Sequence, residues 1–273
     1  MTEFIKRELS RYGSDLFGYV PIDRCHISRP YKLRAFEGTD PSRLGVIIIA
    51  IPYYSHIGSL NISRYAAARD YHAFCDGLFD DLIPKLAEKF SPYRFCGFAD
   101  NSPIFERDAA ALAGLGVIGD NRMLITEKYS SYVFLAEIIT DYPIPISDTY
   151  EIKYCEHCGK CQSACPMVEV GECLSAITQK KGQLCENERA AILKYGSAWG
   201  CDICQDVCPH TQSAIGSGSI YTPVKFFTEN LTPKLTTQSL QDMSDEEFSH
   251  RAYSWRGREV IMRNLKLFEE QDD

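Results

Sequence analysis

Nine of the twelve cysteines in this 273-residue chain lie between positions 155 and 208. Thiols in a reducing compartment do not form lasting disulfides, so a cluster of this kind indicates metal ligation. A Cys-x2-Cys-x2-Cys-x3-Cys-Pro motif begins at Cys155, and a shorter Cys-x2-Cys-x3-Cys-Pro motif begins at Cys201. The longer motif is the run that binds 4Fe–4S clusters in bacterial ferredoxins. The sequence therefore predicts two 4Fe–4S clusters that pass electrons.

The ligands of each cluster follow from a crossing rule, by which the last cysteine of a motif ligates the other cluster. The predicted ligands of the first cluster are Cys155, Cys158, Cys161 and Cys208. The second cluster takes three motif cysteines and one cysteine outside the motifs, for which Cys173 and Cys185 are both available. We expect Cys173, which gives the set Cys165, Cys173, Cys201 and Cys204.

Zinc is the alternative metal, because paired Cys-x2-Cys motifs also bind zinc. Zinc does not require the third cysteine or two copies of the Cys-Pro ending, so the spacing favours iron–sulfur clusters. His157 and His210 lie inside the motifs. Cysteine already fills the ligand positions, so we expect these histidines to be solvated or to hydrogen-bond to cluster sulfurs. We interpret Cys25, Cys75 and Cys96 as ordinary buried small residues.

The elements that position these motifs follow from hydrophobic patterning. Apolar residues at near-helical spacing predict helices, and β-branched or aromatic runs predict strands. The predicted helices cover 1–18, 62–89 and 106–115, and the predicted strands cover 45–54, 93–99 and 131–140. Strands that alternate with helices indicate an α+β or α/β fold.

The rest of the chain divides at proline-rich and small polar segments. The prolines of 142–147 mark a connector, and the small residues of 213–222 predict a loop or linker. Ser244 and Glu247 form a capping-box pattern, which predicts a closing helix up to about Phe268. We therefore expect a mixed α/β domain over 1–145, a double-cluster domain of the bacterial ferredoxin kind over 146–222, and a helical tail over 223–273.

The composition is that of an ordinary soluble globular protein, with 45% hydrophobic and 24% charged residues. The first ten residues are charged, and the longest apolar run, 46–51, is too short to span a bilayer. We therefore expect a cytoplasmic protein with no membrane partner. The net charge of −8 argues against a protein whose whole surface follows nucleic-acid phosphates.

One glycine cluster, 114–119, matches the letters of the dinucleotide fingerprint G-x-G-x-x-G. It follows an Ala-rich helical segment and not a strand, so we reject a dinucleotide site. We interpret Gly116 and Gly119 as residues that let the backbone approach a flat ligand or make a tight turn.

Several spaced blocks resemble epoxyqueuosine reductase, a cobalamin-dependent family that completes queuosine in tRNA and is related to the reductive dehalogenases. The blocks are 62–72 (ISRYAAARDYH), 99–107 (ADNSPIFER), 113–121 (AGLGVIGDN), 173–178 (CLSAIT), both cysteine motifs, 244–248 (SDEEF) and 263–265 (RNL). The resemblance implies a base-off cobalamin between the N-terminal domain and the clusters. It also implies reduction of an epoxide to an alkene.

That reaction requires two electrons and a proton for the departing oxygen. We expect the proton to come from a carboxyl group in a poorly solvated pocket, where burial keeps it protonated. Asp100 occupies the family's position for this acid. The alternative is that Asp100 only caps the helix that follows Pro103.

Further contacts are expected along the helical stretch after residue 62 and at the glycines. The predicted cofactor-binding residues are Arg64, Arg69, Asp70, His72, Gly116 and Gly119. A solvated helix face would also explain the first four. A surface ion pair between the two side chains would explain Glu106 and Arg107.

Two features depart from the family pattern. Asp120 stands where the family usually has lysine, and the chain ends at Asp273, where the family continues into helical repeats that grip tRNA. We therefore expect a short form of this reductase, with tRNA a doubtful partner and an electron donor such as ferredoxin or flavodoxin. The alternatives are a reductive enzyme for another small substrate and a non-catalytic 4Fe–4S electron carrier.

Overall fold

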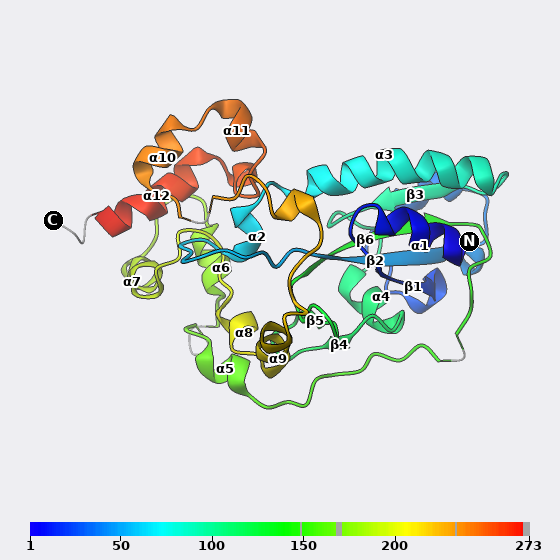
Figure 1. The fold of residues 1–273 in the computed structure, drawn as a ribbon, viewed down its shortest axis with the longest axis horizontal. Helices are drawn as coiled ribbons and strands as arrows, with labels where there is room; N and C mark the ends of the chain where they lie inside the picture. Colours follow the sequence, from blue (N-terminus) through cyan, green and yellow to red (C-terminus); the bar gives the residue numbers. More distant parts are fainter. Residues whose placement is uncertain (148, 168–170, 233, 270–273) are drawn as a thin grey trace.

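The computed structural model describes residues 1–147, 149–167, 171–232 and 234–269. Its N-terminal part is built on a four-stranded sheet in the order β1–β2–β6–β3 (Figure 1). The strands are β1 (Leu16–Pro21), β2 (Gly45–Pro52), β3 (Phe95–Phe98) and β6 (Val133–Thr140). Every pair of neighbouring strands is antiparallel. Of the two fold classes predicted from the sequence, the structure therefore has the α+β class.

Strand β2 lies inside the sheet, between β1 and β6, and all eight of its residues are buried. Successive side chains of a strand point to opposite faces. Ile47 and Ile49 pack with residues of α1 (Thr2–Ser10) and α3 (Tyr71–Lys89), whereas Ile48 packs with Ala110 of α4 (Glu106–Leu112). The sheet is therefore covered on both faces, as Figure 1 shows, and the three predicted strands are confirmed.

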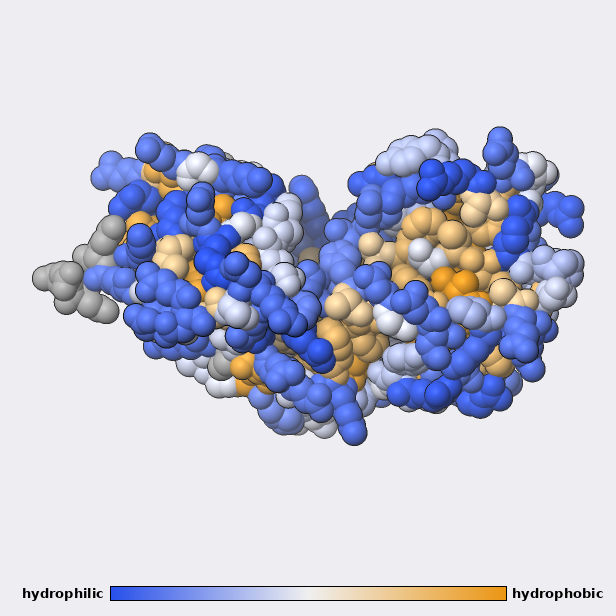
Figure 2. Space-filling view, turned by 90° about the horizontal axis from the view of Figure 1, so that it is seen from above, coloured by the Kyte–Doolittle hydropathy of each residue, from blue (hydrophilic) through white to orange (hydrophobic). Residues whose placement is uncertain are grey.

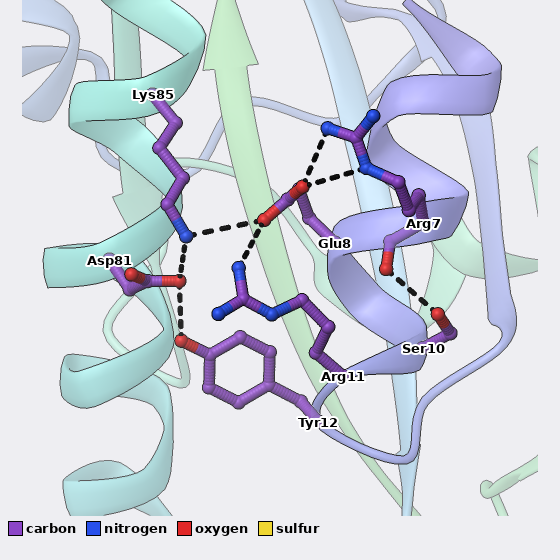
Figure 3. Close-up of polar contacts among 7 residues, drawn as sticks. All are labelled: Arg7, Glu8, Ser10, Arg11, Tyr12, Asp81 and Lys85. Carbon is purple, nitrogen blue, oxygen red and sulfur yellow. Dashed lines mark hydrogen bonds and ion pairs between the residues drawn. The ribbon is translucent and has the colours of Figure 1, made fainter.

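Helix α1 is tied to α3 by the buried side chain of Glu8 (Figure 3). Its carboxylate accepts hydrogen bonds from Arg7 at 2.8 Å, from Arg11 at 2.8 Å and from Lys85 at 3.2 Å. Asp81 accepts a further hydrogen bond from Lys85 at 2.6 Å. The hydrogen bonds from Arg7 and Arg11 lower the pKa of Glu8 to about 2, so it stays ionised down to acidic pH.

Two predicted helices are wrong in length. The first ends at Ser10, because Gly13 turns the chain with a φ of +75° and Leu16 already begins β1. The second divides into α2 (Arg64–Ala67) and α3, since Asp70 leaves the helical path and accepts a hydrogen bond from the N–H of His72 at 3.0 Å.

The cysteine-rich segment consists of short helices. They are α5 (Lys160–Ala164), α6 (Leu174–Thr178), α7 (Glu186–Tyr195), α8 (Ile203–Asp206) and α9 (Pro209–Ser217). The hairpin strands β4 (Val117–Ile118) and β5 (Leu124–Ile125) lie beside them in Figure 1. The loop or linker predicted at 213–222 is wrong for its first half, which belongs to α9, and holds for 218–222, which follow that helix. Ala214 and Ile220 are buried in the core that contains Ile47.

The C-terminal helices are α10 (Thr237–Asp242), α11 (Asp245–Ser249) and α12 (Arg258–Glu269). Ser244 accepts a hydrogen bond from the N–H of Glu247 at 3.1 Å, as predicted. The predicted closing helix is nevertheless interrupted after Ser249, and α12 begins only after Gly257, which has a φ of +91°. Short 3-10 helices complete the fold: η1 (Ile22–Arg24), η2 (Pro30–Phe36), η3 (Pro41–Arg43), η4 (Lys225–Phe227) and η5 (Ser254–Arg256).

Helix α2 joins the two ends of the molecule. Its Ala66 and Ala67 pack with Trp199, Tyr253 and Ile261 in a second core beneath α10 and α12. Figure 2 shows a notch between the part that contains the sheet and the part formed by the C-terminal helices. Within the described ranges, the helices lack the length and apolar character needed to cross a bilayer.

Candidate functional site

Four cysteines from the two motifs line one cavity of about 370 Å³. The first three come from the loop before α5 and from its first turn, and Cys208 directly precedes α9. Gly159 has a φ of +72°, which glycine adopts without strain and which turns the loop around this space. The four are Cys155, Cys158, Cys161 and Cys208, the set assigned to the first cluster from the sequence.

The second set of cysteines lies next to the first. Burial, together with the neighbouring thiols Cys165 and Cys173, raises the pKa of Cys201 to about 11 and that of Cys204 to about 12. Cys161 of the first set also raises the pKa of Cys204, so the two sets adjoin. Thiols in such surroundings become thiolates when a metal neutralises them, and both sets therefore suit metal clusters.

Cys185 has a different place. It begins α7, where its N–H donates a hydrogen bond to Glu188 at 2.8 Å and its side chain caps the first turn. Glu188 also accepts a hydrogen bond from Lys180 at 2.5 Å. Cys185 thus has a structural partner of its own, whereas Cys173 lies among other thiols. The choice of Cys173 as a ligand stays a prediction that this arrangement favours.

Both histidines of the motifs pair with carboxylates. His157 Nδ1 lies 2.7 Å from Asp120 Oδ1, and His210 Nε2 lies 2.8 Å from Glu156 Oε2. The pair with Asp120 joins the β4–β5 hairpin to the loop that begins at Cys155. The ligand atoms of Asp120, Cys155 and His157 lie within 4.8 Å of one another.

The cluster segment is fastened to the sheet by residues that sequence patterns did not single out. Tyr132, just before β6, donates a hydrogen bond to Asp206 of α8 at 2.5 Å, and Ser131 donates one to Gln205 at 2.9 Å. Asp202 receives hydrogen bonds from the hydroxyl of Ser63 at 2.6 Å and from the N–H of Arg64 at 2.6 Å. Polar residues beside cysteine motifs were the available signal, but their partners lie far away in the sequence.

A second titratable group forms at the start of α3. His72 Nδ1 lies 2.8 Å from Asp70 Oδ1, and His72 Nε2 lies 3.8 Å from Asp100 Oδ2. The hydrogen bond with Asp70 raises the pKa of His72. Burial opposes the charge of Asp70, but the hydrogen bonds from His72 outweigh it and lower its pKa. The structure thus brings together three residues that the sequence singled out separately.

Asp100 itself lies on an exposed loop after β3. Its φ is +58°, and its side chain is 73% exposed. The poorly solvated pocket expected around this acid is therefore not what surrounds its carboxyl group. The alternative role as a helix cap is also wrong, because α4 begins after Phe105 and has no side-chain cap.

The N–H of Asp100 donates a hydrogen bond to Glu106 Oε1 at 2.9 Å. The surface pair expected between Glu106 and Arg107 is wrong, since Arg107 binds Asp108 at 2.8 Å. Glu106 turns inward and meets Glu137 of β6, which is fully buried. A lone glutamate in the apolar strand 131–140 was the sequence signal for this pair.

The six residues predicted to bind a cofactor do not line one cavity. Arg64, Arg69, Asp70 and His72 share the α2–α3 segment, and the Nε atoms of Arg64 and Arg69 are buried without a hydrogen-bond partner in the described part of the chain. Gly119 lines the cysteine cavity, and Gly116 lines a cavity of about 980 Å³. A Cβ on Gly116 would lie 2.3 Å from the carbonyl oxygen of Ile125, which explains this glycine by the tight β4–β5 hairpin.

Comparison with known proteins identifies the relatives of this chain. No family profile matches it. An epoxyqueuosine reductase of Gloeobacter violaceus is 33% identical over 234 residues, which cover 80% of this chain and 72% of that protein. A crystal structure of epoxyqueuosine reductase with an epoxyqueuosine-modified tRNA stem loop matches with a TM-score of 0.74 and 26% identity, over 98% of this chain and 81% of the other.

A structure of the Bacillus subtilis epoxyqueuosine reductase, in which an aspartate-bearing catalytic loop is swung out of the active site, matches with a TM-score of 0.71. It is 26% identical and covers 98% of this chain and 82% of that one. The fold and the aligned sequence thus agree over most of the molecule. The chain belongs to the epoxyqueuosine reductase family.

Proposed function

We propose that this protein reduces the epoxide of epoxyqueuosine in tRNA to an alkene. The observation that carries the proposal is the alignment of 98% of the chain with the reductase solved with a modified stem loop. The group of Asp70, His72 and Asp100 supports it, because these titratable side chains lie together where the family resemblance places a proton donor.

The reaction balances with two electrons and two protons. Both carbon–oxygen bonds of the epoxide break, a carbon–carbon double bond forms, and the oxygen leaves as water. Bound 4Fe–4S clusters and cobalamin would supply the electrons one at a time. The side chains of this protein have to hold the substrate and deliver the protons.

Asp100 is the proposed proton donor to the departing oxygen. His72 Nε2, 3.8 Å from Asp100 Oδ2, is placed to return a proton to that carboxylate. Because Asp70 raises the pKa of His72, more of the imidazole is protonated near neutral pH. In the Bacillus subtilis relative the catalytic loop bears an aspartate and swings out. The exposure of Asp100 suits a loop of this kind, which must close over substrate to exclude water.

The cysteines are proposed as ligands of two 4Fe–4S clusters, in the two sets already described. A zinc ion binds sulfur at about 2.3 Å, which would draw its four sulfurs to within about 4 Å of one another. Among the described residues, no three cysteine sulfurs lie within 4.8 Å of one another. The first set instead surrounds a cavity of about 370 Å³, which suits the larger volume of a cubane.

Cobalamin is proposed on the family resemblance. Arg64 and Arg69 would hold it, because their buried, unpartnered Nε atoms can donate to its amide or phosphate oxygens. Gly116 and Gly119 would contribute by shaping the hairpin. Absorbance and mass spectra of protein mixed with cobalamin test this assignment. Protein that does not bind cobalamin would leave only electron transfer by the clusters.

The expectation that tRNA is a doubtful partner is wrong. A relative that aligns with 98% of this chain was solved with an epoxyqueuosine-modified tRNA stem loop, which supports tRNA as the substrate. The net charge of −8 was a poor guide to RNA binding, because a net charge averages over the surface and does not locate the cations. The proposed substrate is therefore an epoxyqueuosine-containing tRNA, and the proposed electron donor remains a ferredoxin or flavodoxin.

The test is conversion of epoxyqueuosine tRNA by reconstituted protein under anaerobic conditions with a chemical reductant. Nucleosides from the digested tRNA are separated and identified by mass. We expect loss of the epoxide nucleoside and gain of a product lighter by one oxygen. Protein that carries both clusters and cobalamin but leaves the epoxide intact would refute the proposed function.

A further inference from the structure

A buried carboxyl group lies behind the Asp100 loop. Glu137 is fully buried in β6, where it pairs in register with Ile48 on one side and Phe98 on the other. Within the described residues, neither of its carboxyl oxygens makes a hydrogen bond of ordinary length and angle, although the buried hydroxyl of Ser102 is a nearby donor that lowers its pKa. Burial outweighs this donor and raises the pKa, because an ionised carboxylate in such a place would lose most of its hydration.

The group that faces Glu137 is another carboxyl, that of Glu106, at the first residue of α4. Two adjoining carboxyl groups, one fully buried and one half-buried, resist carrying a charge at the same time, and they can hydrogen-bond to each other only when one holds a proton. Burial raises the pKa of both, and the charge of Glu106 raises that of Glu137 further. The other titratable or charged groups that act on the pair are Lys32 of η2, Tyr71, His72 and Cys75 of α3, Cys25 after η1, and Asp100.

Glu106 has a second partner on its outer side. Its Oε1 accepts the hydrogen bond from the N–H of Asp100 at 2.9 Å. Asp100 has a φ of +58°, which is uncommon for a non-glycine residue and which a hydrogen bond to its N–H helps to hold. An ionised acceptor holds an N–H more strongly than a neutral one.

We propose that Glu106 and Glu137 share a single proton and together position the Asp100 loop. Protonated Glu137 donates to Glu106, and Glu106 remains a carboxylate that holds the backbone N–H of Asp100. Glu106 and Glu137 are positioning residues in this proposal, and its catalytic consequence rests on the proposed role of Asp100 as the acid. The chemistry consists of one proton held between two carboxyl groups, with no bond to substrate.

This arrangement predicts an anchored loop within a window of pH. When pH rises until the shared proton leaves, two buried negative charges repel each other and Glu106 moves away from Asp100. When pH falls until both groups are neutral, Glu106 becomes a weaker acceptor. Glu137→Gln removes the upper pH limit of this window, since the amide N–H of the glutamine donates to Glu106 at every pH.

Hydrogen exchange of the Asp100 amide in the full reconstituted protein tests the positioning. Glu106→Ala should speed exchange about ten- to a hundredfold, the loss expected for a hydrogen bond to a charged acceptor. If the Glu106→Ala variant does not fold, Glu106→Gln is used in its place, because glutamine keeps the side-chain volume. With rising pH, the wild type should exchange progressively faster than Glu137→Gln measured at the same pH. Equal protection in all variants at all pH values would overturn the positioning role.

Infrared spectroscopy tests the shared proton. At neutral pH the wild type should show a protonated glutamate carboxyl band that Glu137→Gln lacks. Glu8→Gln is the matched control, because Glu8 is also buried but is surrounded by cations, and it should keep the band. Absence of the band in the wild type would overturn the proposal. Neither measurement needs substrate, so these results stand apart from failure of the protein to reduce epoxyqueuosine.

Discussion

Replacement of Cys173 by Ala tests whether this cysteine completes the second cluster. Cys173 precedes α6 without forming a side-chain cap, and its thiol raises the pKa of Cys201 and of Cys204. Cys185 is bound to Glu188 at the start of α7. The two cysteines that the sequence left open thus differ in their surroundings, and a pair of variants can separate them.

The expected change is in iron content. Wild-type protein with two cubane clusters holds about eight irons per chain. Cys173→Ala should lower this to about four if the second cluster is lost, or to about seven if three cysteines retain a three-iron cluster. Cys185→Ala should keep about eight, although loss of the helix cap costs up to about 1 kcal/mol of stability.

The assay is anaerobic reconstitution, followed by measurement of iron and acid-labile sulfide per chain and by electron paramagnetic resonance. The resonance of oxidised protein distinguishes a three-iron cluster from the loss of a whole cluster. Cys185→Ser is a further control, because its hydroxyl can still cap α7. A Cys185→Ala protein with about four irons, beside a Cys173→Ala protein with about eight, would refute the ligand assignment.

Three further variants test the acid, the α1–α3 contact and the hairpin. Asp100→Asn should keep both clusters but lower turnover by about 10²- to 10⁴-fold, and near-wild-type turnover would remove Asp100 as the acid. Because the pKa of Glu8 falls from 4.5 to about 2 in the folded state, its stabilisation is complete above pH 4.5 and is lost as pH falls toward 2. Thermal unfolding of Glu8→Gln should therefore depend less on pH over this range, and an unchanged pH dependence would contradict this. Gly116→Ala should destabilise the fold by about 1–3 kcal/mol in urea unfolding, because its Cβ would lie 2.3 Å from the carbonyl oxygen of Ile125. Gly216→Ala in α9 is the control and should not destabilise the fold, because its Cβ meets nothing within 4 Å.

The parts of the site that sequence predicts best are those set by local spacing. Cys155, Cys158 and Cys161 lie within one loop and the first turn of α5, so their spacing alone brings them to one cavity. Cys208 required the crossing rule, a regularity of the cluster motif, and it lines the same cavity. The buried strand 45–54 was equally evident, because a β-branched run without polar positions suits a strand covered on both faces.

Contacts between distant segments were not predictable in this way. Hydrophobic patterning gives a strand's faces but not its neighbours, so the antiparallel order β1–β2–β6–β3 had to come from the structure. The same limit applies to Glu106, whose nearest charged neighbour in sequence is Arg107 but whose partner in space is Glu137. The loop predicted at 213–222 failed for 213–217 because small residues are typical both of loops and of tightly packed helices.

The α2–α3 segment connects the proposed electron path to the proposed acid. At one end, the N–H of Arg64 binds Asp202, the residue after Cys201. At the other end, the N–H of Asp70 donates to the carbonyl of His250 at 2.8 Å, while its carboxylate orients His72 toward Asp100. The segment is thus hydrogen-bonded to the cysteine segment at one end and to the C-terminal helices at the other. In the proposed reaction, electrons and protons must reach one substrate, and a short segment fixed at both ends suits that requirement.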